Sequence, residues 1–165
     1  MYNLIVQLRY KLLVCLTHNM ALPLMKIIRS PQKFSPTKQM LHLLPRGMLG
    51  KELVTMLDRK NFKLLPYHAK HDIKHNLLQY DTTDEGEVYL QYFMLGNRHP
   101  SFPVAATVAY GFITMPEHWS KFKKAYQHGA SCKPVAGLPW FTLLDKPVQL
   151  LIQKINENDI ALPHH

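Results

Sequence analysis

The stretch His71-Asp72-Ile73-Lys74-His75, followed after eleven residues by Glu87, decides how this chain of 165 residues is organised. If residues 70–79 form a helix, the two histidines lie at positions i and i+4 on one face, about one turn apart. Two imidazoles placed in this way can converge on a single ion.

The segment after this helix predicts a turn and a second helix. Residues 81–84 (Asp-Thr-Thr-Asp) end the first helix, and Thr82 with Glu85 forms a capping box for the next one. Glu87 then falls in the first turn of that helix, and a tight antiparallel turn brings it back toward the two histidines. Gly86 has no side chain and allows the two backbones to approach.

Two imidazoles and a carboxylate form a plausible site for a divalent cation. We predict His71, His75 and Glu87 as metal ligands, with Asp72 as a fourth, and either zinc or ferrous iron suits this set. The alternative is chance: ten histidines give many pairs at i and i+4, and a solvated face of histidine and aspartate is common on helices.

The same residues resemble a known signature. HDIKH, eleven residues and then Glu87 is similar to the HDxxHx11E motif of the coenzyme Q (ubiquinone) biosynthesis protein four family. The resemblance covers roughly residues 20 to 155, and further residues carry it: Ser35-Pro36-Thr37, Leu49-Gly50, Tyr67 and Pro139-Trp140.

That resemblance implies a metal-dependent oxidative decarboxylation in ubiquinone biosynthesis, in which the carboxylate of a prenylated aromatic ring is replaced by hydroxyl. His71, His75 and Glu87 would hold the metal. Asp72 would have a catalytic role, either as a fourth ligand or by orienting a histidine. The implied partners are a prenylated quinone precursor or other isoprenoid lipid, a membrane surface and other quinone-biosynthesis proteins.

A second hypothesis comes from a different class of protein. The chain would be a non-catalytic lipid-binding scaffold that organises quinone-biosynthesis enzymes at a membrane, and the ion would only join two helices. Structural zinc sites usually have four protein ligands, which this motif offers if Asp72 takes part. The sequence leaves open whether the protein is an enzyme, which metal it binds, which quinone pathway it serves and whether it is a homo-oligomer.

Composition limits the class of protein. The formal net charge of +9 points to an anionic partner, and the absence of a nucleic-acid-binding signature argues for a membrane surface rather than nucleic acid. Cys15 and Cys132 are too few and too distant for a disulfide framework. Arg9 and Lys11 interrupt the apolar N-terminal segment, which argues against a signal peptide and a transmembrane span there. We expect a cytoplasmic protein that associates peripherally with the inner face of a membrane.

Apolar periodicity predicts an all-α, single-domain bundle of about seven helices over residues 1–156, with a disordered tail over residues 157–165. In the helix over residues 116–128, Trp119, Phe122 and Tyr126 are expected to share one face, with the lysines of that helix solvated. Aromatic and basic residues interleaved in this way can alternatively meet phosphates or lipid headgroups. Small residues in the helix that starts at residue 101 suit close helix packing or the wall of an apolar tunnel. The expected helices cover residues 3–19, 35–44, 51–58, 70–79, 85–96, 101–115, 116–128 and a segment from 145.

Overall fold

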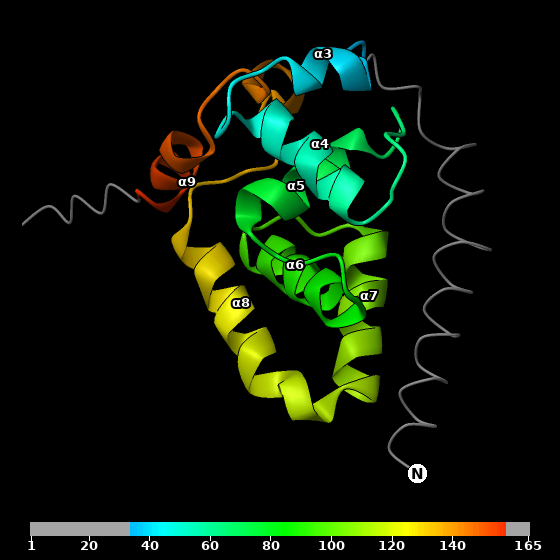
Figure 1. Ribbon diagram of the computed structural model, residues 1–165. Coiled ribbons are helices and arrows are strands. Elements are labelled where there is room, and N and C mark those ends of the chain that lie inside the picture. Colours follow the sequence, from blue (N-terminus) through cyan, green and yellow to red (C-terminus); the bar gives the residue numbers. More distant parts are fainter. Residues whose placement is uncertain (1–33, 158–165) are drawn as a thin grey trace, which may run out of the picture.

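The computed structural model describes residues 34–157, so the helix expected over residues 3–19 and most of the expected tail lie outside it. Within the described part the fold is an all-helical bundle, as the sequence predicts (Figure 1). Its elements are α3 (Lys38–His42), α4 (Leu49–Arg59), α5 (Ala69–Leu78), α6 (Asp84–Gly96), α7 (Phe102–Thr114), η2 (Pro116–His118), α8 (Trp119–Ser131), η3 (Trp140–Leu143) and α9 (Val148–Asn156).

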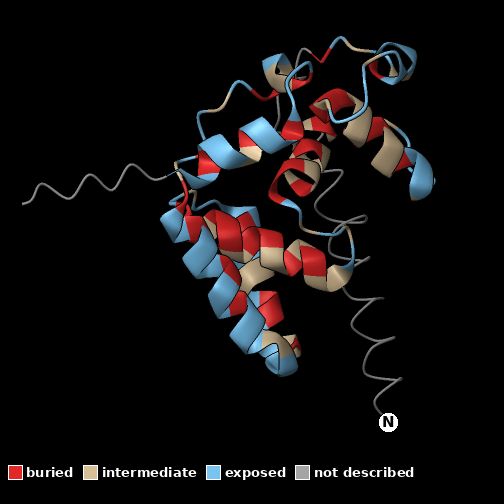
Figure 2. Ribbon diagram, turned by 60° about the vertical axis from the view of Figure 1, so that its left-hand side comes forward, coloured by how far each residue is buried: buried red, intermediate tan, exposed pale blue. Residues whose placement is uncertain are grey.

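Helix α6 is the centre of one half of the bundle. It packs between α7 and α8, while in the other half α3 packs against α4, and α5 packs against α4 and α9 (Figure 1). Val88, Leu90, Phe93 and Met94 of α6 are at most 1% exposed. The contrast between α6 and α8 is visible in Figure 2, where α6 is mostly buried or intermediate and α8 carries a long exposed face. A helix that is apolar on most sides is expected at such a central position.

Two glycines allow α6 and α8 to cross closely. A Cβ at Gly96 of α6 would overlap the backbone carbonyl of Tyr126 in α8, and a Cβ at Gly129 of α8 would overlap the carbonyl of Phe93 in α6. The two backbones therefore meet without side chains between them. The helix expected over residues 116–128 extends further in the structure, and α8 continues to Ser131 because this contact stabilises its last turn.

The buried side chain of Asn97 fixes the segment that follows α8. Its Nδ2 donates to the carbonyls of Gly129 at 2.9 Å and Lys133 at 3.0 Å, and its Oδ1 accepts from the backbone N–H of Val135 at 2.8 Å. A buried amide with its donors and acceptor paired in this way avoids the cost of desolvation. Asn97 thus does more than end α6.

The start of α4 is attached to the segment that precedes α9. Leu49 and Gly50 donate their N–H groups to the carbonyls of Lys146 and Leu144 at 2.9 and 2.8 Å, and Val148 donates to Gly47 at 2.8 Å. The first N–H groups of a helix have no partner within the helix, so these bonds serve in place of a capping side chain.

Several helix starts differ from the sequence predictions. Thr37 caps α3 and Thr83 caps α6, whereas we expected a start at Ser35-Pro36 and a cap at Thr82. In the first case Phe34 packs edge-on against Phe141, and the chain up to Thr37 stays non-helical. In the second case the bond from the Gly86 N–H to the Thr83 hydroxyl moves the cap by one residue.

The inward face of α8 also differs from the prediction. Phe122 is buried, but Trp119 and Tyr126 are 47% and 44% exposed. The residues that accompany Phe122 toward α6 are Ala125 and Gly129. The contact of Gly129 with the α6 backbone fixes the rotation of α8 about its axis, and at this rotation Trp119 and Tyr126 are turned outward.

Among residues 34–157, no helix combines the length and the apolar character needed to cross a membrane.

The glycine crossing predicts an unusual response to substitution. Gly→Ala inside a helix normally stabilises by about 1 kcal/mol. We expect Gly129→Ala to destabilise the protein by at least about 2 kcal/mol, because the Cβ would overlap the α6 backbone. Gly137→Ala is the matched control, since nothing lies within 4 Å of a Cβ at that position. Urea unfolding measures both, and equal stability of the two variants would contradict the close crossing.

Candidate metal centre

The α5–α6 hairpin is shaped by its turn. Helix α5 ends at Gln79, which has a left-handed backbone with φ of 58°. The chain then reaches Thr83, which caps α6, and Gly86 passes so close to the Asp81 carbonyl that a Cβ there would overlap it. This turn places the first turn of α6 beside the last turns of α5, as the sequence predicts.

The hairpin brings three donor atoms together. Nε2 of His75 lies 2.8 Å from Oε2 of Glu87, Nε2 of His71 lies 3.0 Å from the same oxygen, and the two Nε2 atoms are 3.0 Å apart. Each of the three residues offers one ligand atom, and these atoms all lie within 4.8 Å of one another. Among the described residues, this group could hold a metal ion. The i, i+4 spacing and the placement of Glu87 are thereby confirmed.

Two further residues form hydrogen bonds that orient the side chains of His75 and Glu87. The backbone carbonyl of Tyr80 lies 3.0 Å from Nδ1 of His75, so this nitrogen carries a proton and donates it, which leaves Nε2 directed at Glu87. Nε2 of Gln91 donates to Oε1 of Glu87 at 2.6 Å, which leaves Oε2 directed at the histidines. Each of these contacts occupies the atom that is not needed for metal binding.

Burial and the attraction between the histidines and Glu87 have opposite effects on the pKa values at this site. His75 is 2% exposed, whereas the side chains of Glu87 and His71 are 22% and 28% exposed. Burial alone would raise the pKa of Glu87, but the charge and hydrogen bonds of His71 and His75 outweigh it and hold this pKa well below its usual range. Burial would lower the pKa of His75, but its bond to Glu87 and the Glu87 charge outweigh this and raise it.

Asp72 occupies a different position from the three converging residues. Its side chain is 14% exposed, and its Oδ1 lies 3.7 Å from Nδ1 of His68, one turn earlier in the chain. It is not part of the three-residue cluster, although its charge contributes to the raised pKa of His75. The ring of His68 also lies edge-on to that of His71, with the centroids 5.0 Å apart.

The residues present fit a divalent metal ion. With ligand bonds of about 2.0–2.2 Å, neighbouring ligand atoms on one ion lie about 3.0 Å apart at octahedral angles and about 3.4 Å apart at tetrahedral angles, and the separations of 2.8 to 3.0 Å seen here are close to these values. Two imidazoles and one carboxylate suit zinc and also ferrous iron. Three protein ligands, rather than four, leave a position for water or substrate, which is the pattern of catalytic zinc sites.

Tyr80 and Gln91 belong to the site but were not among the residues predicted from the sequence. Gln91 could have been predicted from the sequence, because it follows Glu87 by four residues on the same helix and so lies on the same face. Tyr80 acts through its backbone carbonyl, and side-chain patterns give no information about such a contact.

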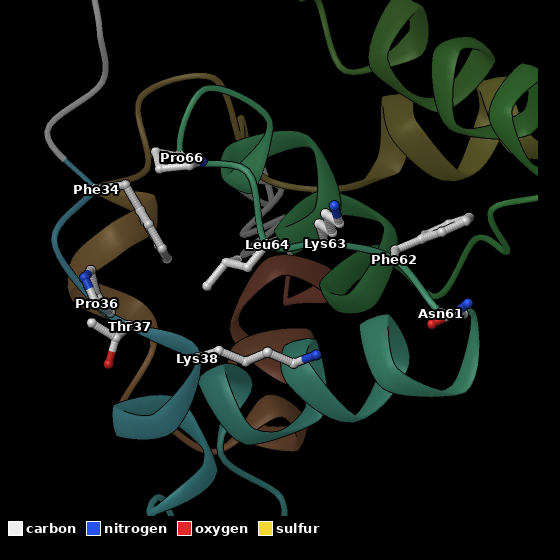
Figure 3. Close-up of a pocket in the computed structure, with 9 residues that line it drawn as sticks. All are labelled: Phe34, Pro36, Thr37, Lys38, Asn61, Phe62, Lys63, Leu64 and Pro66. Carbon is white, nitrogen blue, oxygen red and sulfur yellow. The ribbon is translucent and has the colours of Figure 1, made fainter.

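Two surface pockets lie elsewhere in the described structure. The larger, about 490 Å³, is lined by residues of the segments 34–38 and 61–66, and Figure 3 shows Phe34 and Leu64 pointing toward each other across it. The second, about 290 Å³, lies between α6 and α8. Tyr80 lines this second pocket and its carbonyl also holds His75, so the pocket borders the hairpin turn.

The described part of the chain is therefore a helical bundle that carries a His-His-Glu cluster with metal-binding geometry. No protein-family model and no curated protein matches the chain. Among solved structures, the crystal structure of a "Putative ubiquinone biosynthesis protein" from Nostoc punctiforme is similar, with a TM-score of 0.63 and 20% sequence identity. The match covers 92% of this chain and 81% of that one. At this identity the likeness establishes a common fold.

Gln91 provides a test of the cluster that does not require catalysis. Loss of a residue that orients a ligand typically weakens metal affinity 10–100-fold, and we expect a weakening of about this size for Gln91→Met. Competition with a chromophoric zinc chelator measures it, with Gln153→Met on the exposed side of α9 as the matched control. Equal zinc affinity of the two variants would show that the orientation of Glu87 does not matter.

The charge coupling predicts the pH dependence of the metal-free protein. The pKa of His75 is raised above its ordinary value of 6.5, so protonated His75 stabilises the fold fully below that value. This stabilisation is lost as the pH rises through the raised pKa. In the presence of a chelator, we therefore expect the Tm of the wild type to fall relative to that of His75→Gln between about pH 6 and 8. Parallel Tm profiles would refute the coupling.

Proposed function

We propose that this chain is a metal-dependent enzyme of ubiquinone biosynthesis, which replaces the carboxylate of a prenylated aromatic ring by hydroxyl. The observation that carries the proposal is the convergence of His71, His75 and Glu87, whose Nε2, Nε2 and Oε2 atoms lie 2.8 to 3.0 Å from one another. The fold that the chain shares with the Nostoc punctiforme protein, and the name of that protein, support the pathway.

The protein's own groups prepare the site for this chemistry. The Tyr80 carbonyl fixes the tautomer of His75, and Gln91 turns one carboxylate oxygen of Glu87 toward the two rings. Because His71 is the most exposed of the three, we place the side from which substrate enters next to it. When bound, zinc or iron would supply a Lewis acid for a ring phenolate or carboxylate, and iron would add redox chemistry.

The atoms and electrons of the proposed reaction balance with dioxygen and a two-electron donor as co-reactants. The bond between the ring carbon and the carboxylate breaks and carbon dioxide leaves, while a bond forms between the same ring carbon and oxygen. Dioxygen supplies that oxygen atom, and a two-electron donor with two protons reduces the other atom to water. The protein must therefore be tested with both dioxygen and a reductant.

Asp72 keeps a proposed catalytic role beside the ligands. It lies one residue after His71 on α5, it is largely buried, and its charge favours the protonated form of His75. This supports an action on the histidines more than direct ligation, because its carboxylate faces His68. The membrane surface, the isoprenoid lipid and the other quinone-biosynthesis proteins stay predictions.

The scaffold alternative makes a different prediction for the same three residues. A structural ion would be expected to have four protein ligands, whereas three side chains converge here. A purely structural ion would also contribute its binding energy to folding, so its loss would lower stability sharply.

Glu87→Ala separates the two functions, with Glu85→Ala as the matched control in the same turn of α6. We expect Glu87→Ala to lose bound metal, measured by elemental analysis, and to lose conversion of a prenylated aromatic acid to the hydroxylated product, measured by mass spectrometry. Glu85→Ala should retain both. A large fall in Tm for Glu87→Ala, with no turnover by the metal-loaded wild type, would support the scaffold instead.

A further inference from the structure

A small hollow lies between α6 and α8, and it is the smaller of the two pockets described above, with a volume of about 290 Å³. Its lining consists of two tyrosines, two lysines, an alanine and a histidine: Tyr80, Tyr89, Lys121, Lys124, Ala125 and His128. Small-molecule sites usually measure about 300–1,000 Å³, so a hollow near the lower end of this range suits a compound with a single ring.

Hydrogen bonds to histidines hold both tyrosine rings of this hollow. The hydroxyl of Tyr80 lies 3.2 Å from Nδ1 of His128, and the hydroxyl of Tyr89 lies 2.5 Å from Nδ1 of His118. Because Nε2 of His128 donates to Oδ1 of Asn156 at 3.3 Å, its Nδ1 accepts the proton of Tyr80. Burial raises the pKa of Tyr80 to about 12, so this phenol keeps its proton at neutral pH. The aromatic walls are therefore fixed before a ligand binds, which lowers the entropic cost of binding.

The basic residues of the hollow stand on one side of α8. Lys121, Lys124 and His128 follow one another at spacings of three and four residues, so their side chains project from the same side of the helix. Ala125 lies beside them and is 6% exposed. Its short side chain leaves space that a larger residue at this position would fill.

The two lysines of the hollow have no acidic partner in the described chain. Three other lysines form ion pairs with aspartates, whereas Lys121 and Lys124 form none within residues 34–157. The lining of the hollow also contains no Asp or Glu. Two ammonium groups three residues apart on one helix repel each other, so an anion bound beside both would offset this repulsion.

The lining thus combines aromatic walls with a pair of ammonium groups, and this combination defines the ligand. A ring packs on the tyrosines, and a carboxylate accepts charge-assisted hydrogen bonds from the lysines. A neutral ring would leave the lysines unpaired, and an anion without a ring would leave the aromatic walls in contact with water. We propose that the hollow binds a small aromatic carboxylate with one ring. This goes beyond the function proposed above, because the hollow is a second site and its ligand needs no prenyl tail.

Tyr80 is shared between the hollow and the metal centre. Its side chain lines the hollow, whereas its backbone carbonyl holds His75. A carboxylate could also bind a metal ion at the cluster, so the hollow is tested in the metal-free protein, where that ligand bond cannot form. The result then depends on binding alone, and it stands whether or not the protein catalyses the proposed reaction.

An NMR titration of the metal-free, full chain with benzoate tests this proposal. We expect saturable shifts of backbone amide signals, largest at Tyr80, Tyr89 and residues 121–128, with a Kd on the order of 0.1–1 mM for a ligand of this size. Benzamide has the ring without the charge, and acetate has the charge without the ring, so each should bind at least about 5-fold more weakly. Shifts centred on His71 instead, or equal affinities for benzoate and acetate, would overturn the proposal.

Neutral variants of the two lysines supply the second test. Lys121→Gln combined with Lys124→Gln should weaken benzoate binding about 5–10-fold, because both ion pairs with the ligand are lost. Its circular dichroism spectrum should be unchanged, since both lysines are exposed. Lys123→Gln lies on the same helix but outside the lining, so this matched control should bind benzoate as the wild type does. Wild-type affinity in the double variant, an equal loss in Lys123→Gln, or a wild type without saturable binding would each contradict the proposal.

Discussion

The carboxylate of Glu87 is held against two imidazoles where α5 and α6 meet, and this contact fixes how the two helices must be placed. A mostly buried carboxylate is costly unless charge or hydrogen bonds compensate it. Here His71 and His75 lie within 3.0 Å of one oxygen, and Gln91 occupies the other. The compensation works only while the two helices keep their relative position, so the turn over residues 79–83 and the packing of α6 both serve the site.

Helix α6 joins the site to the body of the fold. Its first turn carries Glu87, one turn later Gln91 orients it, and its last residue, Gly96, forms the close crossing with α8. Its other side packs on Gly111 of α7. A displacement of α6 by α7 or α8 would therefore move Glu87 relative to the histidines of α5. The metal-binding cluster therefore rests on a helix that is buried along most of its length.

The sequence reveals the parts of this structure that depend on spacing along one chain segment. The pair His71 and His75, the hairpin, and the start of α6 near Glu87 all follow from helical periodicity and turn residues. The exposed Trp119 and Tyr126 could not be foreseen, because the close contact of Gly129 with Phe93 decides which side of α8 faces inward. Nor does any sequence pattern encode the Tyr80 carbonyl as the partner of His75. Spacing within a helix is local information, whereas the rotation of one helix against another is a property of the assembled core.

X-ray absorption spectroscopy at the metal edge of the purified protein reports directly on whether these three residues bind a metal ion. With zinc or iron loaded at one equivalent, we expect nitrogen and oxygen ligands at about 2.0–2.2 Å and the outer-sphere scattering of two imidazoles. That imidazole scattering should weaken by half when His71 is replaced by alanine. A spectrum with sulfur ligation, or with water ligands and no imidazole scattering, would contradict the assignment of His71, His75 and Glu87 as a metal centre.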